Sequence, residues 1–447
     1  MPNKIHFVGI GGIGMSGLAE FLHREGHDIT GSDLKNSENT KRLENIGIKI
    51  YYKHDITNLS NPEMVVYSSA IPDNNPEINV DNVPVIKRAK LLNRVMQQRK
   101  YQITISGMHG KTTTASLLTH IFTKAGYDPS ALLGGVLQGT GSNIRYGQGD
   151  YCIVEADEYD RSFLELYPTH TIITNVEAEH MDIYDSLDDI KQSFLKFAQR
   201  VPDQKDIIAC LDDNNLSDIL HQISNVSSYG IEQNADYRAR NCKLETDKSI
   251  FQLVINDKNM GEIEIGLQGK HNILNALACI GMADRCGIKL QQISKALASY
   301  SGSRRRMEIR YQDNNYTLID DYAHHPTEIK ATLQAIRESR NNPIIAIFQP
   351  HLYSRTKEFY REFAQALKLA DKVFVSEIYP AREEPIPGIT SRLITEQDSQ
   401  LKYCQKEKIV DIILDIIEPG SIVITLGAGD INTIHSELIK KIQNNKT

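Results

Sequence analysis

Several features are missing from this 447-residue sequence, and each absence excludes a class of protein. Arg and Lys, 50 in all, do not outnumber the 57 Asp and Glu, and the net charge of −7 argues against a nucleic-acid partner. No apolar run reaches the roughly 18 residues of a membrane span, so we expect no membrane partner. Cysteine is sparse and forms no C-x-x-C pair. The cysteines predict buried, reduced thiols in a cytoplasmic protein rather than a disulfide framework: Cys152, Cys210, Cys242, Cys279, Cys286 and Cys404.

The composition is typical of a globular protein, and the length allows more than one hydrophobic core. Hydrophobic residues make up 40% of the sequence and charged residues 24%, which is ordinary for a folded domain. No internal repeat or low-complexity segment is evident before the polar tail at 444–447. The length predicts about three domains.

A strand followed by glycines opens the chain. Residues 5–8 predict the strand, and a G-x-G-x-x-G turn over residues 9–14 leads into a helix. Such a turn lets backbone amides approach a pyrophosphate. A second predicted strand, 28–32, ends at Asp33, about where an acidic residue meets a ribose hydroxyl. The pattern alone indicates NAD, although any nucleotide diphosphate would suit the same backbone.

The strongest motif follows the apolar strand expected at 103–106. Its residues are Gly107-Met108-His109-Gly110-Lys111-Thr112, and a helix is expected after them. The glycines expose backbone amides to phosphate, Lys111 can reach the β- and γ-phosphates, and Thr112 can hold Mg²⁺. Ile105 stands where the longer P-loop pattern has its first glycine, so this is the shortened form. A chance glycine turn is the alternative, but the strand before it and the helix after it favour a P-loop.

Acidic and imidazole side chains follow two further predicted strands. The strand at 150–155 ends in Glu155, and the strand at 171–175 leads to His180. The carboxyl ends of parallel strands meet at one edge of a sheet, so these groups suit a Mg²⁺ site between nucleotide and substrate. Solvated loop acids, or a structural role for His180, remain the alternatives.

The rest of the chain predicts a strand-rich segment and then another doubly wound α/β pattern. Residues 206–265 predict strands ending in a hairpin with its turn at 258–259. Asn272 opens a helix, where it could simply satisfy backbone groups. Arg305 belongs to a run of three arginines, which is either a solvated face or, beside phosphate, an oxygen clamp.

We therefore expect an α/β protein of three domains. Residues 1–99 form a Rossmann-like domain, residues 100–303 a P-loop ATP-binding domain, and residues 304–447 a second Rossmann-like domain.

Taken in chain order, these motifs resemble those of the Mur ligase family. The resemblance covers essentially the whole chain and rests on these segments: the P-loop, Glu155-Ala-Asp-Glu158, 175–180, Gly269-x-His-Asn-x-x-Asn275, Arg305-Arg306, Asp321-Tyr-Ala-His-His-Pro326 and Gly427-Ala-Gly-Asp430. Residues 6–19 resemble the branch that joins L-alanine to UDP-N-acetylmuramate. The resemblance implies ATP-dependent ligation through an acyl phosphate, in peptidoglycan precursor synthesis, with ATP and Mg²⁺ as cofactors.

The resemblance also implies roles for individual residues. Catalytic roles fall to Lys111, Glu155, His180, His324 and Arg355. ATP would contact Gly107, Met108, His109, Gly110, Lys111, Thr112, Thr113, Asn272 (adenine), Arg305 and Asp321 (ribose). The UDP-sugar would contact Gly11, Gly12, Ile13, Gly14, Met15, Asp33 and Ser69, and Mg²⁺ would bind Thr112, Glu155 and His180. With reactants spread over three domains, closure of the last domain is expected before chemistry.

Three positions depart from the family pattern. Met108 replaces the usual Thr of the P-loop, Met307 replaces an aromatic residue, and Leu352 stands where many relatives carry Arg. The last departure leaves Arg355 as the better substrate-binding candidate.

Other functions compete with this interpretation. A ligase that re-uses murein tripeptide, or a folate polyglutamylating enzyme, shares the P-loop and the third domain, but the N-terminal glycine pattern speaks against both. A P-loop regulator or binding module would explain Lys111 but not the outer domains. An NAD-dependent dehydrogenase would leave Lys111, Glu155 and His180 without a purpose. We expect a monomer or weak homodimer.

Overall fold

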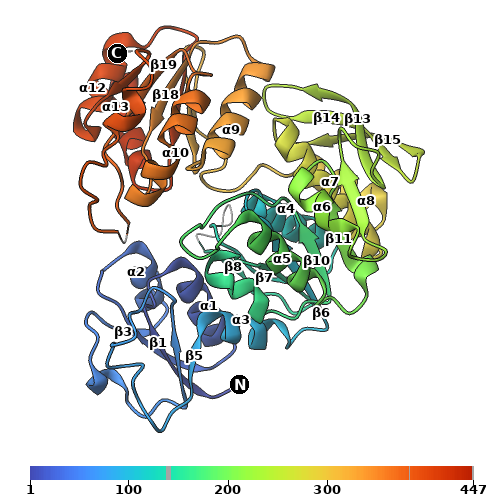
Figure 1. Cartoon of the computed structure of the whole chain (residues 1–447), viewed down its shortest axis with the longest axis vertical. Coiled ribbons are helices and arrows are strands. Elements are labelled where there is room, and N and C mark those ends of the chain that lie inside the picture. The colour runs from blue at the N-terminus through green and yellow to red at the C-terminus, as the bar shows by residue number, and fades with distance from the viewer. Residues whose placement is uncertain (137–141, 382, 445–447) are drawn as a thin grey trace. The chain divides into compact units, whose positions relative to one another are not determined.

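The computed structural model describes residues 1–136, 142–381 and 383–444 (Figure 1). These residues fold into an α/β protein with three sheet-containing domains, and the strands that they contain form sheets of five, ten and six strands. By compactness the chain divides into two units. The first unit comprises 1–241, 251–265 and 274–300, and the second comprises 242–250, 266–273 and 301–447.

The first sheet is parallel throughout and has the order β3-β2-β1-β4-β5. Its central strand, β1, is almost wholly buried, as expected of a parallel strand covered on both faces. The strands are β1 (Lys4–Val8), β2 (Asp28–Ser32), β3 (Lys49–Tyr51), β4 (Met64–Tyr67) and β5 (Val85–Lys87). The helices are α1 (Ile13–Arg24), α2 (Glu38–Asn45), α3 (Arg88–Met96) and the short η1 (Ile56–Asn58).

In the second sheet the P-loop strand β6 lies between β9 and β10, parallel to both. The carboxyl ends of these three strands therefore lie at the same edge of the sheet. The strands are β6 (Tyr101–Ser106), β7 (Ser130–Leu132), β8 (Ile144–Arg145), β9 (Tyr151–Glu155), β10 (His170–Ile173), β11 (Ile207–Cys210), β12 (Ser227–Gly230), β13 (Tyr237–Leu244), β14 (Ser249–Ile255) and β15 (Lys258–Ile265). The helices are α4 (Lys111–Lys124), α5 (Leu187–Ala198), α6 (Asn214–Leu220), α7 (Lys270–Arg285) and α8 (Leu290–Ala298), with η2 (Tyr159–Glu165) and η3 (Gln204–Asp206).

The hairpin turn of this sheet differs from the expectation. β14 ends at Ile255 and β15 begins at Lys258, so Asn256 and Asp257 form the turn and the predicted turn at 258–259 is wrong by two residues. Both turn residues have positive φ, 47° and 63°. Asn and Asp tolerate that left-handed conformation, which two-residue hairpin turns require.

The third sheet has the order β16-β17-β21-β18-β19-β20 and is parallel except for β16, which runs antiparallel to β17. Helices cover both faces of this sheet. Alternate residues of the central strand β18 therefore belong to different hydrophobic cores: Ala346 and Phe348 pack in one, and Ile345 and Ile347 pack in the other. The strands are β16 (Glu308–Gln312), β17 (Thr317–Asp321), β18 (Ile344–Phe348), β19 (Lys372–Val375), β20 (Leu401–Tyr403) and β21 (Ile422–Leu426). The helices are α9 (Pro326–Ser339), α10 (Tyr353–Leu367), α11 (Arg392–Thr395), α12 (Lys406–Ile416), α13 (Ile434–Asn444) and η4 (Ile431–Thr433).

Among the described residues, no helix combines the length and the apolar character needed to cross a membrane.

Candidate active site

The P-loop turn is shaped by two glycines with left-handed backbones. Gly107 has φ 131° and Gly110 has φ 81°. A Cβ on Gly107 would lie 2.0 Å from Oγ1 of Thr174, the residue after the neighbouring strand β10, so only glycine fits there. Gly110 is the N-cap residue of α4 and brings no side chain to the helix start. The first N–H groups of α4 therefore face the turn, the arrangement that binds phosphate.

Lys111 is held inside this turn by a buried carboxylate. Its Nζ donates to Glu158 Oε1 and Oε2 at 2.9 and 2.8 Å, and to the carbonyl oxygen of Met108 at 3.1 Å. Burial alone would lower the pKa of Lys111, but the Glu158 and Asp157 carboxylates outweigh it and the pKa is raised. Lys111 is thus a charged ammonium group fixed where a phosphate would meet the amides.

Glu158 also contacts the predicted metal-binding histidine. His180 Nε2 lies 3.4 Å from Glu158 Oε1, and the Glu158 side chain is only 3% exposed. Burial would raise the pKa of Glu158, but Lys111 and His180 overcome that effect and lower it. A buried carboxylate thus links two predicted catalytic residues. Sequence reasoning placed Glu158 in a motif but gave it no role.

Thr112 and Glu155, both predicted to bind Mg²⁺, are in direct contact. Thr112 Oγ1 donates to Glu155 Oε2 at 3.2 Å. A Cβ on Gly134 would lie 2.5 Å from Glu155 Oε2, and one on Gly135 would lie 2.7 Å from the Thr112 methyl group. The segment after β7 can therefore pass close to these oxygens only because it carries two adjacent glycines. The glycine pair was the available signal in the sequence, and sequence reasoning missed it.

Oxygen donors from a hydroxyl and a carboxylate, with an imidazole nearby, fit a divalent cation. Thr112 and Glu155 are brought together, whereas His180 makes its contact with Glu158.

His109 anchors the P-loop to the strand beside it. Its backbone N–H donates to Asn175 Oδ1 at 2.8 Å, and its carbonyl accepts from Thr174 Oγ1 at 2.7 Å. His109 Nε2 lies 2.9 Å from Glu177 Oε2. Met108 and Thr113 are both buried, so the side chains of these two residues support the turn.

The first glycine turn presents backbone amides in a second place. Gly12 is the N-cap residue of α1 without a side-chain cap, and Ile13 is exposed. The N–H of Gly11 donates to Asp33 Oδ2 at 2.8 Å. Asp33 thus lies against the turn itself. Met15 is a core residue, and Ser69 is an exposed residue after β4.

A buried glutamate lies beneath this first turn, and no motif pointed to it. The N–H groups of Gly9 and Ile10 donate to the carbonyl of Ser32, at 2.9 and 3.0 Å, and the Ser32 hydroxyl donates to Glu77. Glu77 also accepts from Asn58 Nδ2 at 2.6 Å. Burial would raise its pKa, but the neighbouring His6, with Nε2 at 3.7 Å, and the hydrogen bonds from Ser32 and Asn58 lower it to about 2.

In the second unit, Asp321 is a buried carboxylate at the end of β17. It accepts hydrogen bonds from the N–H groups of Met307 and Ala323, at 2.7 and 2.8 Å. Burial raises the pKa of Asp321 to about 6, although Arg306 acts in the opposite direction. Such a group can accept a hydroxyl hydrogen bond when it is ionised.

The guanidinium of Arg305 ties the start of the C-terminal domain to the loop after β21. It donates to the carbonyls of Gly427 at 2.6 Å and Gly429 at 3.0 Å, and its Nε lies 3.3 Å from Asp320 Oδ2. These contacts position the loop, and the contact of Arg305 with ATP stays a prediction.

The other predicted residues of the second unit lie on or beside helix starts. Asn272 is buried in the first turn of α7, and its Nδ2 donates to the Gln268 carbonyl at 2.9 Å. His324 Nδ1 lies 3.2 Å from Glu328 Oε2. Arg355 lies in the first turn of α10, whose N-cap residue Leu352 has φ 72°. That backbone is strained for a leucine, and strain of this kind clusters at functional sites.

A P-loop α/β domain with strand-end carboxylates, set in the chain between two doubly wound domains, defines a class of nucleotide-dependent ligases. Three family profiles match in the same order: "Mur ligase family, catalytic domain" over residues 4–100, "Mur ligase middle domain" over 105–283 and "Mur ligase, glutamate ligase domain" over 305–429. The chain belongs to the Mur ligase family.

Three individual relatives show which members of the family resemble the chain. The UDP-N-acetylmuramate–L-alanine ligase of Geotalea daltonii is 40% identical over 450 residues, covering 98% of each chain. The crystal structure of the UDP-N-acetylmuramate-alanine ligase MurC of Thermotoga maritima matches with a TM-score of 0.84 and 29% identity, covering 99% of each chain. The murein peptide ligase of Psychrobacter arcticus matches less well, with a TM-score of 0.70 and 25% identity over 98% of each chain.

Proposed function

We propose that this chain joins L-alanine to UDP-N-acetylmuramate in an ATP-dependent reaction that passes through an acyl phosphate. The observation that carries the proposal is the contact of the P-loop lysine, Lys111, with the buried Glu158, in a chain 40% identical along its length to a ligase of that name. A dehydrogenase has no use for a lysine fixed in this way. The weaker match to the murein peptide ligase makes tripeptide re-use the second candidate.

The reaction balances in two steps. A lactyl carboxylate oxygen attacks the γ-phosphorus of ATP, the bond from phosphorus to the β-phosphate oxygen breaks, and ADP leaves. The alanine amine then attacks the acyl carbon, loses a proton, and expels phosphate. Phosphoryl transfer of this kind depends mainly on positioning and on neutralising charge.

We assign the charge-neutralising role to Lys111 and the first amides of α4. Thr112 and Glu155 would hold Mg²⁺, with His180 as a further ligand, and the ion would shield the repulsion between the carboxylate and the triphosphate. When phosphate binds, the interaction between Glu158 and Lys111 would weaken, because the carboxylate and the phosphate compete for the same ammonium group. Asn272 would bind adenine, Asp321 the ribose, and His324 and Arg355 the substrates.

We assign the UDP-sugar to the first glycine turn. The N–H groups of Gly11 and Gly12 already donate to Asp33 and to the Gly9 carbonyl, so the amides of residues 13 and 14 at the start of α1 are the ones that suit a diphosphate. ATP already has its own site at Lys111. We further propose domain boundaries near residues 99 and 303, cytoplasmic action, and a monomer or weak homodimer.

The test is a phosphate-release assay on the full chain in which each component is omitted in turn. We expect release only when ATP, Mg²⁺, UDP-N-acetylmuramate and L-alanine are all present. Equal release with the tripeptide L-Ala-γ-D-Glu-meso-diaminopimelate in place of L-alanine would favour the second candidate. Reduction of NAD would overturn both.

A further inference from the structure

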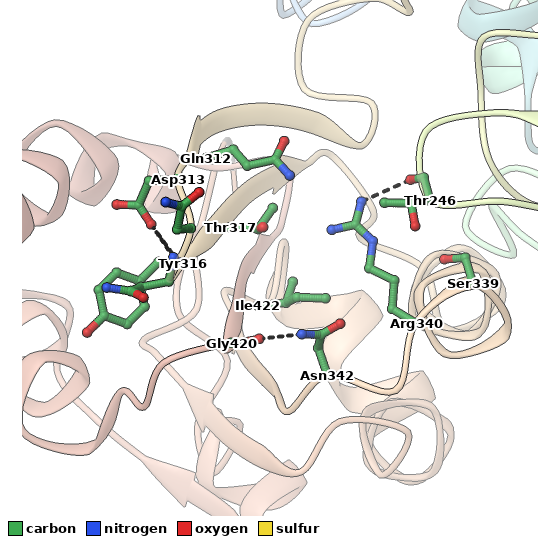
Figure 2. Close-up of a pocket in the computed structure, with 12 residues that line it drawn as sticks. Thr246, Gln312, Asp313, Tyr316, Thr317, Ser339, Arg340, Asn342, Gly420 and Ile422 are labelled. Carbon is green, nitrogen blue, oxygen red and sulfur yellow. Dashed lines mark hydrogen bonds between the residues drawn. The ribbon is translucent and has the colours of Figure 1, made fainter.

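A polar pocket of about 300 Å³ lies in the second unit, away from every residue assigned above (Figure 2). Its lining includes Thr317 and Ile422, the first residues of β17 and β21. The pocket is therefore at the edge of the third sheet where the parallel strands begin. Asp321 and Gly427 lie at the opposite ends of the same two strands.

Arg340, just after α9, is the cationic side chain in the lining of this pocket. Its Nη2 donates to the carbonyl of Thr246 at 2.9 Å, a bond drawn in Figure 2. Its Nε is buried and has no hydrogen-bond partner among the residues that the structure describes. Burial lowers the pKa of Arg340, with Asp247 acting in the opposite direction, yet a guanidinium stays protonated. Arg340 as a whole is half-buried, so its charged guanidinium lies at the wall of the pocket, where an anion could meet it.

The acid in the lining, Asp313, is already engaged elsewhere. Its Oδ1 accepts from the N–H groups of Asn315 and Tyr316 at 2.7 Å each, and its Oδ2 accepts from the Tyr311 hydroxyl at 2.6 Å. No ion pair joins Asp313 to Arg340 within the described part of the chain. Asp313 therefore does not pair with the guanidinium, and the carboxylate that acts on Arg340 electrostatically, Asp247, makes no ion pair with it within the described residues.

The remaining walls carry neutral polar groups. In Figure 2, Gln312, on β16, lies above Thr317, and Arg340 approaches the pocket from another side. Asn342 is also in the lining, and its Nδ2 donates to the carbonyl of Gly420 at 2.7 Å. Amides and hydroxyls of this kind recognise a ligand that both donates and accepts hydrogen bonds.

We propose that this pocket binds a small monocarboxylate that also carries an amide or hydroxyl group, with its carboxylate on the part of the Arg340 guanidinium that lines the pocket. The planar fork of arginine matches a carboxylate well. Phosphate suits the pocket less, because the lining pairs a single cation with an acid and offers no second positive charge for a dianion. The chemistry described is that of an N-acylated amino acid or a short peptide. The site is independent of the proposed ligase reaction.

Calorimetric titration of the full chain tests this, with N-acetylglycine as the probe and N-acetylglycinamide and inorganic phosphate as comparisons. We expect N-acetylglycine to bind the wild type, and the uncharged amide and phosphate to bind at least about tenfold more weakly. Arg340→Gln should abolish the binding, and Arg340→Lys, which keeps the charge but loses the fork, should weaken it. Lys330→Gln is the matched control, because Lys330 is an exposed cation on the same helix.

The melting temperature of each variant is measured beside the titration. If Arg340→Gln does not fold, Gln312→Leu on another, exposed wall replaces it and should weaken binding severalfold. Saturating ATP with Mg²⁺ should leave the titration unchanged. No binding by the wild type, binding of phosphate as tight as that of N-acetylglycine, binding that survives both substitutions, or displacement by ATP would each overturn the proposal.

Discussion

Two strand-turn-helix segments of this chain have the same backbone design but different side chains. In one, β1 leads through residues 9–12 into α1, and in the other, β6 leads through residues 107–110 into α4. A glycine is the N-cap residue of both helices, and neither cap makes a side-chain hydrogen bond. Both turns can therefore present amides to a diphosphate.

The two turns differ in the charged groups that lie beside them. The second turn ends in Lys111, which is fixed by the buried Glu158 beside Thr112 and Glu155. Residues 9–12 of the first turn include no cation. The Asp33 carboxylate lies against Gly11, and the Arg88 guanidinium lies against Gly14, where a built Cβ would be 3.0 Å from Nη1. Backbone amides suffice to hold a diphosphate, whereas transfer of a phosphoryl group needs charge placed in advance. The first segment thus fits a binding site and the second a reaction centre.

The buried glutamates behind the two turns repeat this contrast. Glu77 accepts hydrogen bonds from groups that stay in place, among them Ser32 and Asn58. Glu158 holds Lys111, which would also serve the ATP phosphates. Four substitutions test the contrast, in decreasing order of expected effect.

Replacing Lys111 with Ala should lower alanine-dependent phosphate release on the order of 10³-fold, because the fixed charge at the phosphates is lost. Steady-state kinetics with all substrates measures this. Lys124→Ala is the matched control, since Lys124 is an exposed lysine at the end of the same helix. A turnover close to wild type in a folded Lys111→Ala variant would remove the lysine from the reaction.

Replacing Glu158 with Gln should destabilise the ligand-free chain by about 3 kcal/mol, because it leaves the Lys111 charge buried without its carboxylate. Urea denaturation at neutral pH measures this, and ATP with Mg²⁺ should recover part of the loss. Glu165→Gln, at an exposed position nearby in the chain, is the control. Unchanged stability would show that the Lys111–Glu158 pair contributes little.

Replacing Glu77 with Gln should cost about 2 kcal/mol at pH 7 and leave the turnover number unchanged. The pKa of Glu77 is lowered from 4.5 to about 2 in the folded chain. Its ionised form therefore adds stability above pH 4.5, and that contribution disappears as the pH falls towards 2. The stability difference between variant and wild type should shrink over the same range. A difference that does not depend on pH would contradict this account.

Replacing Gly12 with Ala should have the smallest effect. Gly12 has φ −61°, and the nearest atom to a built Cβ is 3.5 Å away, so the fold tolerates the methyl group. We expect UDP-N-acetylmuramate to bind about tenfold more weakly, because the methyl group occupies space that the diphosphate needs. Calorimetry on the full chain measures this, with NAD as the negative control. Unchanged binding would move the UDP-sugar away from this turn.

The sequence revealed the parts of this account that depend on local pattern. Apolar runs and glycines located β1, β6 and the helices after them, and the predicted strands at 28–32 and 317–321 agree with β2 and β17 residue by residue. The expectation that the carboxyl ends of neighbouring parallel strands lie together correctly placed Glu155 beside Thr112.

Contacts between segments that are far apart in the sequence could not be predicted from local pattern. Glu77 lies 45 residues from Ser32 and belongs to no motif. Which acid of the 155–158 segment would face Lys111 depends on the short η2 segment, where Asp160 and Arg161 have positive φ. The guanidinium of Arg305 donates to the carbonyls of Gly427 and Gly429, more than 120 positions further along the chain, and its contact with ATP stays a prediction.

The most direct test of the central claim follows an oxygen atom. UDP-N-acetylmuramate labelled with ¹⁸O in its lactyl carboxylate is incubated with the full chain, ATP, Mg²⁺ and L-alanine, and the released phosphate is analysed by mass spectrometry. If the carboxylate attacks the γ-phosphorus at the Lys111 site, each phosphate carries one ¹⁸O atom from the sugar. Phosphate without the label, released at the same rate when alanine is omitted, would contradict the account.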